Sequence, residues 1–237
     1  MDKVSIIIPF YNCQYVNEAI ESALNQNYSN IEIIVVDDGS TKYVNKVKKY
    51  VNRIKYIKKP NGGTASALNT GIKNASGDYI MWLSSDDVFQ PSKISKQLFF
   101  MKEKNASICY SPYILVNERT VPVSGKVDGQ FYFRDHKEFY RNLQKNCFVN
   151  GSTIVIRKDV FSKVGLFNEK IRYAHDYDYW LRAAQLYQFY YLDEPLVLYR
   201  IHEKMTTKKK RVPLIKEFAQ VKRKHRNTAL KRREPFL

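Results

Sequence analysis

Cysteines are scarce in this sequence, and long apolar runs are missing from it. There are only three cysteines in 237 residues, Cys13, Cys109 and Cys147, and their spacing matches neither a zinc site nor a disulfide framework. We therefore expect small buried thiols in a reducing compartment. No apolar run approaches the roughly 20 residues that a helix needs to span a bilayer. The chain begins Met-Asp-Lys and leads straight into a strand pattern, so no signal peptide is expected.

Acidic residues are also in the minority, at 23 Asp and Glu against 40 Lys and Arg, which gives a net charge of +17. The excess is uneven, because residues 203–237 hold 13 basic and 3 acidic side chains while residues 1–202 hold 27 and 20. A basic balance favours anionic partners, such as a phosphorylated ligand, anionic lipid or nucleic acid. The hydrophobic content of 44% excludes a chain that is disordered throughout.

The first hundred residues alternate between apolar strand patterns and helical patterns. Such a βαβ series predicts a parallel sheet with right-handed crossovers and helices on both faces. The expected fold class is therefore α/β, with a Rossmann-like, mixed but mainly parallel sheet flanked by helices. The expected strands cover 4–9, 31–36, 54–57 and 79–83, and the expected helices 17–25, 44–51 and 64–74.

The second hundred residues continue the alternation with weaker signals. Residues 122–134 are rich in turn-forming residues and are expected to form a mobile loop. Pro195 suggests an edge or a bend in the last strand. The expected helices are 92–104, 136–146, 158–164 and 176–187, and the expected strands 107–116, 153–156 and 190–198.

The chemistry is predicted at the ends of the first strands. Asp86-Asp87 follow the apolar run 79–83, so they should lie where this strand leaves the sheet. Pro9-Phe-Tyr-Asn12 and Asp37-Asp38-Gly39-Ser40 stand just past two other strands. Open α/β sheets bind ligands at this carboxyl edge. Two adjacent carboxylates favour a hard divalent cation that holds a phosphate, and an aromatic and an acceptor nearby would suit a nucleotide.

The order and spacing of these motifs resemble family 2 glycosyltransferases. The resemblance rests on Pro9-Phe-Tyr-Asn12, Val35-Val-Asp-Asp-Gly-Ser40, Asn61-Gly-Gly63, Ala67-Leu-Asn-Thr-Gly71, Ser85-Asp-Asp87, Asn150-Gly-Ser-Thr153, Gly165-Leu-Phe-Asn168, His175-Asp-Tyr-Asp-Tyr-Trp-Leu-Arg182 and Leu198-Tyr-Arg-Ile-His202. It implies a GT-A fold over residues 1–205, with a nucleotide-binding half at 1–100 and an acceptor-binding half at 101–205. It also implies inverting transfer from a nucleotide sugar, UDP-linked, to a saccharide or lipid-linked acceptor.

The resemblance also implies roles for single residues. Tyr11 and Asp38 would hold the base, Asp86 the ribose or the metal region, and Asp87 a divalent metal, Mn²⁺ or Mg²⁺. His202 would complete the metal shell, and Asp176 would be the general base that takes the proton of the acceptor hydroxyl. The other expected donor-binding residues are Pro9, Asn12, Asn61, Gly62, Asn69 and Ser85.

Two positions depart from the family pattern. His175 stands where relatives carry a glutamate beside the candidate base, which places the role of base on Asp176 alone. Leu68 stands where many relatives carry an arginine, so a contact to the pyrophosphate is missing from this position.

The residue types leave alternatives open. Asp176 could be merely an N-cap, and Asp178 could be the acting base. His202 could simply be packed, and Trp82 could be core or a sugar platform. The aromatic side chains that could line an acceptor cleft or fill the core are Tyr173, Tyr177, Tyr179 and Trp180.

The basic tail, residues 206–237, has an apolar stripe of Leu214, Ile215, Phe218 and Val221 at helical spacing. It is expected to form an amphipathic helix over 212–233 that adsorbs to an anionic membrane surface. A solvated end and contact with another protein or domain are the alternatives, and nucleic-acid binding is disfavoured. The expected setting is surface polysaccharide or glycolipid synthesis on the cytoplasmic face of the membrane.

Two other functions compete with this interpretation. An inactive GT-A fold that only binds a nucleotide or sugar is consistent with His175. A nucleotidyltransferase would want a glycine-rich phosphate loop after the first strand, and the segment Pro9-Phe-Tyr-Asn-Cys13 has no glycine.

Overall fold

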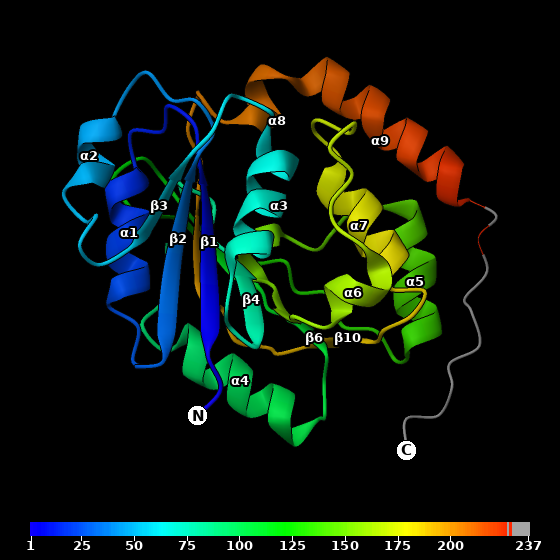
Figure 1. Ribbon diagram of the computed structural model, residues 1–237. Coiled ribbons are helices and arrows are strands. Elements are labelled where there is room, and N and C mark those ends of the chain that lie inside the picture. Colours follow the sequence, from blue (N-terminus) through cyan, green and yellow to red (C-terminus); the bar gives the residue numbers. More distant parts are fainter. Residues whose placement is uncertain (227, 229–237) are drawn as a thin grey trace.

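A seven-stranded sheet forms the centre of the molecule (Figure 1). The computed structural model describes residues 1–226 and 228. The strand order is β10-β6-β9-β4-β1-β2-β3, in which β9 runs antiparallel to its neighbours β4 and β6 and the other neighbouring pairs are parallel. These strands are β1 (Val4–Phe10), β2 (Ile31–Asp37), β3 (Lys55–Lys58), β4 (Tyr79–Trp82), β6 (Ile108–Tyr110), β9 (Val155–Arg157) and β10 (Phe189–Tyr191). The mainly parallel α/β fold expected from the sequence is confirmed.

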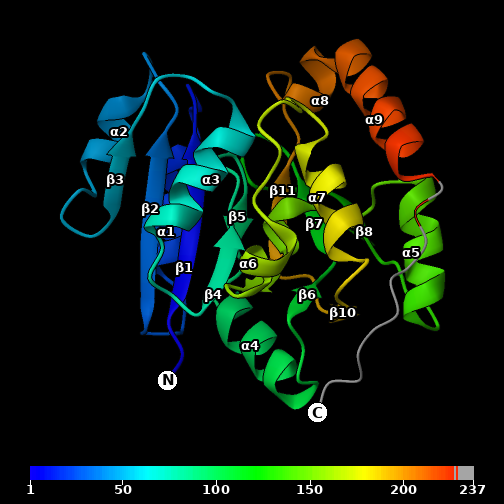
Figure 2. The same cartoon turned by 45° about the vertical axis from the view of Figure 1, so that its right-hand side comes forward.

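A second sheet has four strands in the order β5-β11-β7-β8, and its strands β11, β7 and β8 lie to the right of β1 and β2 in Figure 2. Its strands are β5 (Val88–Phe89), β7 (Tyr113–Val116), β8 (Pro122–Asp128) and β11 (Val197–Arg200). Strand β5 follows directly on the Asp86-Asp87 pair and pairs antiparallel with β11, which leads to His202. This pairing brings two distant predicted site segments side by side.

Helices cover both faces of the central sheet. One face packs against α1 (Val16–Leu24), α2 (Val44–Lys48) and α4 (Lys93–Glu103). The other face packs against α3 (Thr64–Asn74), α5 (His136–Lys145), α6 (Val160–Val164) and α7 (His175–Ala183). A 3-10 turn, η1 (Gly151–Thr153), precedes β9. Strand β1 alternates between these cores, with Ile7 on the second face and Ile6 and Ile8 on the first. Each core draws side chains from both predicted halves of the chain.

Three expectations about secondary structure were wrong. Residues 122–134 were expected to be a loop, but β8 pairs antiparallel with β7 over 122–128. The single strands expected over 107–116 and 190–198 are each two strands that belong to different sheets, β6 and β7, and β10 and β11. Pro112 and Pro195 stand in the two breaks, where a residue without an N–H cannot continue a ladder.

The tail forms two helices, α8 (Thr206–Lys209) and α9 (Arg211–His225), and the rest of the expected 212–233 helix lies outside the described residues apart from 226 and 228. In Figures 1 and 2, α9 lies along the outside of α7 and α5. Val221 is buried against the body, and Phe218 stacks on Tyr177 with ring centroids 5.2 Å apart. Within the described residues, no helix combines the length and the apolar character needed to cross a membrane.

Candidate active site

A cavity of about 390 Å³ opens at the carboxyl ends of β1, β2 and β4. This is the edge at which parallel α/β sheets bind ligands, and the volume is in the range of small-molecule sites. Its wall includes eight residues expected from the sequence: Pro9, Tyr11, Asn12, Asp38, Ser85, Asp86, Asp176 and His202. The other four expected residues, Asn61, Gly62, Asn69 and Asp87, do not line it.

Asn12 ties the loops after β1 and β2 together. It has a φ of 50°, a left-handed conformation that asparagine tolerates better than most residues. Its side-chain oxygen accepts the N–H groups of Thr41 at 2.9 Å and Lys42 at 2.7 Å, and its own N–H donates to Ser40 Oγ. Tyr11 beside it is 55% exposed, so its ring is available to stack on a base.

Asp38 is buried in the cavity wall and already holds the loop that follows β3. One carboxylate oxygen accepts Lys59 Nζ at 2.8 Å and the Gly62 N–H at 2.9 Å. The other accepts the Gly63 N–H at 2.7 Å and Asn61 Nδ2 at 3.0 Å. Four donors fill the acceptor sites of a carboxylate. Asn61 and Gly62 therefore shape the site through Asp38, and a base N–H would have to displace one of these partners.

Asp86 and His202 meet on the cavity wall. His202 Nε2 lies 3.0 Å from Asp86 Oδ2, and the two come from the segments that β5 and β11 bring together. The His202 ring also packs edge-on against Tyr15, with centroids 5.1 Å apart. The Asp86 side chain remains 28% exposed, so it can reach a ligand in the cavity.

Asp87 lies behind this wall and is only 2% exposed. Its carboxylate accepts Ser152 Oγ at 2.6 Å and the Arg200 N–H at 3.1 Å. Burial, together with the charge of Asp86, raises the pKa of Asp87 well above its usual range. This placement does not favour the role of metal ligand that the sequence suggested for Asp87, because its oxygens face protein donors and not the cavity.

Arg200 is a site residue that the sequence reasoning did not assign, although it belongs to the segment that ends at His202. Its buried guanidinium donates to the Asp86 carbonyl at 2.8 Å and pairs with Glu18 at 2.6 Å. It also lies 4.4 Å from the ring centroid of Tyr15. Its backbone N–H donates to the Asp87 carboxylate, so Arg200 contacts both residues of the Asp86-Asp87 pair. Its place two residues before His202 is the only signal in the sequence, because its burial beside Asp86 and Asp87 arises from the pairing of β5 with β11.

Asp176 lies in the first turn of α7 and faces the cavity. The N-cap residue of this helix is Ala174, so the N-cap interpretation of Asp176 was wrong. One carboxylate oxygen accepts the Tyr177 N–H at 2.7 Å. Burial raises the pKa of Asp176, while His175 and this N–H oppose the increase. A carboxylate with a raised pKa is a stronger base, which suits proton removal from a hydroxyl.

Asp178 points away from the cavity and is fully buried. Its oxygens pair with Arg182 Nε at 2.9 Å, Lys224 Nζ at 2.8 Å and His225 Nε2 at 3.1 Å. Burial opposes ionisation, but the hydrogen bonds from these three side chains hold the pKa of Asp178 below its usual range. Asp178 is therefore unsuited to be the base, and it joins α7 to α9 instead.

Trp82 serves both the core and the cavity wall. Its ring packs against His175 at 5.7 Å and Phe167 at 6.2 Å between centroids. A Cβ on Gly151 would come within 2.3 Å of this ring, so glycine is required there. Burial lowers the pKa of His175, which favours the neutral imidazole. Of the four aromatic side chains that could line an acceptor cleft or fill the core, Tyr173 lines the cavity, and the others are core residues: Tyr177, Tyr179 and Trp180.

Asn69 and Leu68 do not reach the donor cavity. Asn69 is buried and joins α3 to the loop after α6, where it accepts the Phe167 N–H at 3.0 Å and donates to the Phe167 carbonyl at 2.9 Å and to Glu169 at 2.8 Å. The expected donor contact of Asn69 is therefore replaced by a structural one. Leu68 packs in the core, so no cation approaches the cavity from this position.

Two cationic side chains on the wall were not predicted. Arg172 and Lys204 come from the loop before α7 and the segment before α8. Their charges suit the oxygens of a diphosphate, and they come from parts of the chain far from Leu68.

Asp86 and His202 could hold a divalent cation together with oxygens of a bound diphosphate. Asp86 and His202 offer an oxygen and a nitrogen side by side, and both atoms suit Mn²⁺. Among residues 1–226 and 228, no group of three or more His, Cys, Asp and Glu side chains could hold a metal ion. The protein would thus supply part of the coordination shell, as is usual where a metal also binds phosphate oxygens.

Comparisons with known proteins identify the family and the fold. The model of the family described as Glycosyl transferase family 2 matches residues 5–165. An uncharacterized glycosyltransferase of Rickettsia prowazekii is 40% identical over 208 residues, a match that covers 86% of this chain and 65% of that relative. The chain therefore spans less than two thirds of this relative's length.

Solved structures resemble the whole described fold. S. aureus TarS 1-349 in complex with UDP-GlcNAc has a TM-score of 0.69 at 23% identity, covering 87% of this chain and 61% of that one. The mannosyltransferase PcManGT from Pyrobaculum calidifontis, in complex with GDP-Man and Mn²⁺, has a TM-score of 0.70 at 15% identity, covering 97% and 66%. These similarities show that the chain has the GT-A fold expected from its sequence.

Proposed function

The chain belongs to glycosyl transferase family 2, and we propose that it transfers a sugar from a UDP-linked donor to a hydroxyl group with inversion at the anomeric carbon. The observation that carries the proposal is the composition of one cavity. Its wall combines the Asp86–His202 pair at the sheet edge with a separate carboxylate, Asp176, on α7. Inverting transfer requires a base apart from the groups that hold the diphosphate, because attack and departure occur on opposite faces of the sugar.

Asp176 is the proposed general base. Its carboxylate takes the proton of the acceptor hydroxyl as the oxygen attacks the anomeric carbon, and the nucleoside diphosphate leaves with the bonding electrons. The raised pKa of Asp176 supports this role, and so does the assignment of Asp178 to a buried ion-pair network. His175 lines the same cavity, but it is only 6% exposed and its imidazole lies against Trp82, whereas Asp176 is more exposed, so Asp176 is the better placed base.

The donor is proposed to lie along the ends of β1, β2 and β4. Tyr11 stacks on the base, and Arg172 and Lys204 neutralise diphosphate charge. Asp86 and His202 would hold a divalent cation, which assigns to Asp86 the metal contact expected for Asp87 from the sequence. Such an ion stabilises the charge that develops on the leaving diphosphate. The similar TarS structure is a complex with UDP-GlcNAc and the PcManGT structure a complex with GDP-Man and Mn²⁺, which supports a nucleotide sugar and a metal.

The acceptor is proposed to be a saccharide or lipid-linked glycan at an anionic membrane face. Helix α9 leaves Val212 and Ile215 exposed beside basic side chains, although Phe218 and Val221 of the expected apolar stripe are used inside the molecule. A short apolar strip with lysines and arginines around it suits weak, charge-assisted adsorption.

A nucleotide-sugar screen tests the proposal. We expect UDP-GlcNAc or another UDP-sugar, with Mn²⁺, to raise the melting temperature by about 5 °C or more at roughly a hundredfold excess over Kd. GDP-mannose serves as the control donor, and each donor is also measured without metal. Slow Mn²⁺-dependent release of UDP from the bound donor would show turnover. Binding without any release would favour an inactive sugar-binding fold, and no binding of any UDP-sugar would refute the proposal.

A further inference from the structure

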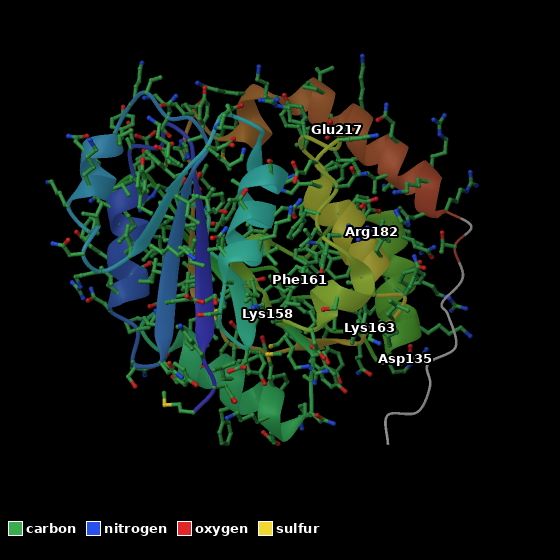
Figure 3. All side chains as sticks on the ribbon, in the orientation of Figure 1. Asp135, Lys158, Phe161, Lys163, Arg182 and Glu217 are labelled. Atoms are coloured by element: carbon green, nitrogen blue, oxygen red, sulfur yellow. The ribbon has the colours of Figure 1, made fainter. Side chains whose placement is uncertain are left out.

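Helix α9 places one carboxylate at the entrance to the helix that carries the candidate base. Glu217 accepts three successive main-chain N–H groups: that of Arg172 at 3.1 Å, that of Tyr173 at 2.6 Å and that of Ala174 at 3.1 Å. Figure 3 shows Glu217 on α9 above the loop that runs into α7. Consecutive N–H groups that converge on one anion form a strong, charge-assisted contact.

The contact matters because the start of α7 has no cap of its own. The N-cap residue is Ala174, whose methyl group cannot accept a hydrogen bond. A carboxylate near the N-terminus of a helix also interacts favourably with the helix dipole. Glu217 binds the N–H groups of the three residues that lead into α7, so it fixes the approach to this helix from another helix, 43 to 45 residues further along the chain.

The loop that Glu217 holds contributes directly to the cavity. Arg172 and Tyr173 line it, and Asp176 follows two residues after Ala174. The position of Asp176 thus depends on the path of the backbone at 172–174. A base must be placed to within a fraction of an ångström of its productive position, so displacement of this loop would reduce proton transfer.

Glu217 is itself held in place by the rest of α9. Phe218 next to it stacks on Tyr177 of α7. Lys224 and His225 pair with Asp178 of the same helix, at 2.8 Å and 3.1 Å. These contacts fix α9 against α7, which distinguishes the Glu217 carboxylate from a mobile surface side chain.

From this geometry we propose that Glu217 is a positioning residue for Asp176. The proposal rests on the role of Asp176 given above and extends it to the tail. Helix α9 would then be part of the active-site framework, and its loss would impair the chemical step more than donor binding.

The test compares Glu217→Ala and Glu217→Gln with Lys224→Ala in the full chain. Lys224 is the matched control, because it also joins α9 to α7 but does not contact the loop. Hydrogen–deuterium exchange should show amides 172–174 exchanging about tenfold or more faster in Glu217→Ala than in wild type or Lys224→Ala. Glu217→Gln keeps one acceptor oxygen and should lie between them.

Hydrolysis of UDP-GlcNAc with Mn²⁺ provides the functional measurement. We expect Glu217→Ala to lower kcat about 10- to 100-fold, with partial recovery in Glu217→Gln. KM should rise by a smaller factor, because Arg172, a proposed diphosphate contact, belongs to the same loop. Equal kcat losses in Glu217→Ala and Lys224→Ala, unchanged kcat in Glu217→Ala, or unchanged exchange at 172–174 would each overturn the proposal. Exchange does not depend on turnover, so a wild-type protein without hydrolysis would count against the proposed function and leave the exchange result to decide whether Glu217 holds the loop.

Discussion

On both walls of the cavity, a carboxylate accepts main-chain N–H groups just before a helix, but the two carboxylates come from different kinds of structure. On the donor side, formed by the loops after β1, β2 and β4, Asp38 accepts the N–H groups of Gly62 and Gly63, just before α3. On the base side, formed by the loop before α7 together with α7 and α9, Glu217 accepts the N–H groups of residues 172–174, just before α7. In each case a carboxylate from another segment fixes the entrance of a helix.

The walls differ in how the carboxylate is supplied. Asp38 belongs to a short motif at the end of a strand, and the sheet register places it without further help. Glu217 belongs to a helix beyond the predicted 1–205 domain and reaches its position only because α9 packs on α7. The donor side is thus built by the sheet and the base side by packing between helices. The base side should respond more strongly to changes in distant residues.

The largest effect is expected at Asp176 on the base side. Asp176→Asn should reduce sugar transfer about 1,000-fold or more, because an amide cannot accept the hydroxyl proton. The affinity for UDP should change less than about threefold, since the substitution leaves the proposed donor contacts, including Arg172 and Asp86, in place. Transfer assays and calorimetric titration with UDP and Mn²⁺ measure the two quantities.

Asp178→Asn is the control two positions further along the same helix. It should lower the free energy of unfolding by about 3 kcal/mol, because it removes the buried charge that pairs with Arg182 and Lys224. The folded fraction should keep most of its transfer activity. Retained transfer in Asp176→Asn would remove the base assignment and with it the functional difference between the two walls.

The sequence predicted the donor side better than the base side for a physical reason. Strand ends are visible as apolar runs that stop at polar residues, so Pro9, Asp38 and Asp86 could be placed at one edge. The sequence does not show in which direction each side chain points at that edge. Asp86 and Asp87 are adjacent in the chain, and only the pairing of β5 with β11 shows that one faces the cavity and the other is buried.

On the base side, the helix over 176–187 was expected, but its partners were not. The apolar stripe of the tail suggested a membrane, whereas Phe218 and Val221 pack inside the molecule. Periodicity shows that a helix has an apolar face and does not show what covers it. The prediction for residues 122–134 was wrong for another reason. Turn-forming residues dominate this segment, although part of it forms the edge strand β8, which pairs with β7.

A smaller effect separates the two acidic residues of the donor side. Asp86→Ala should weaken Mn²⁺-dependent UDP binding about 100-fold, since one proposed metal ligand is lost. Asp87→Ala should instead lower the free energy of unfolding by about 2 kcal/mol, because Ser152 and the Arg200 N–H lose a buried acceptor. Calorimetric titration and urea unfolding of both variants give the comparison. Loss of metal-dependent binding in Asp87→Ala alone, at wild-type stability, would restore the assignment made from the sequence.

The smallest effect is expected on the outer face of α9, where the base side meets solvent. Ile215 is 58% exposed and Val221 is 3% exposed on the same helix. Ile215→Ser should change the free energy of unfolding by less than about 0.5 kcal/mol, while the matched change Val221→Ser should cost about 2 kcal/mol. Ile215→Ser should nevertheless weaken adsorption to vesicles that contain phosphatidylglycerol, measured by co-sedimentation. Unchanged adsorption would limit α9 to its structural role against α7, because the exposed apolar strip would then have no part in binding a surface.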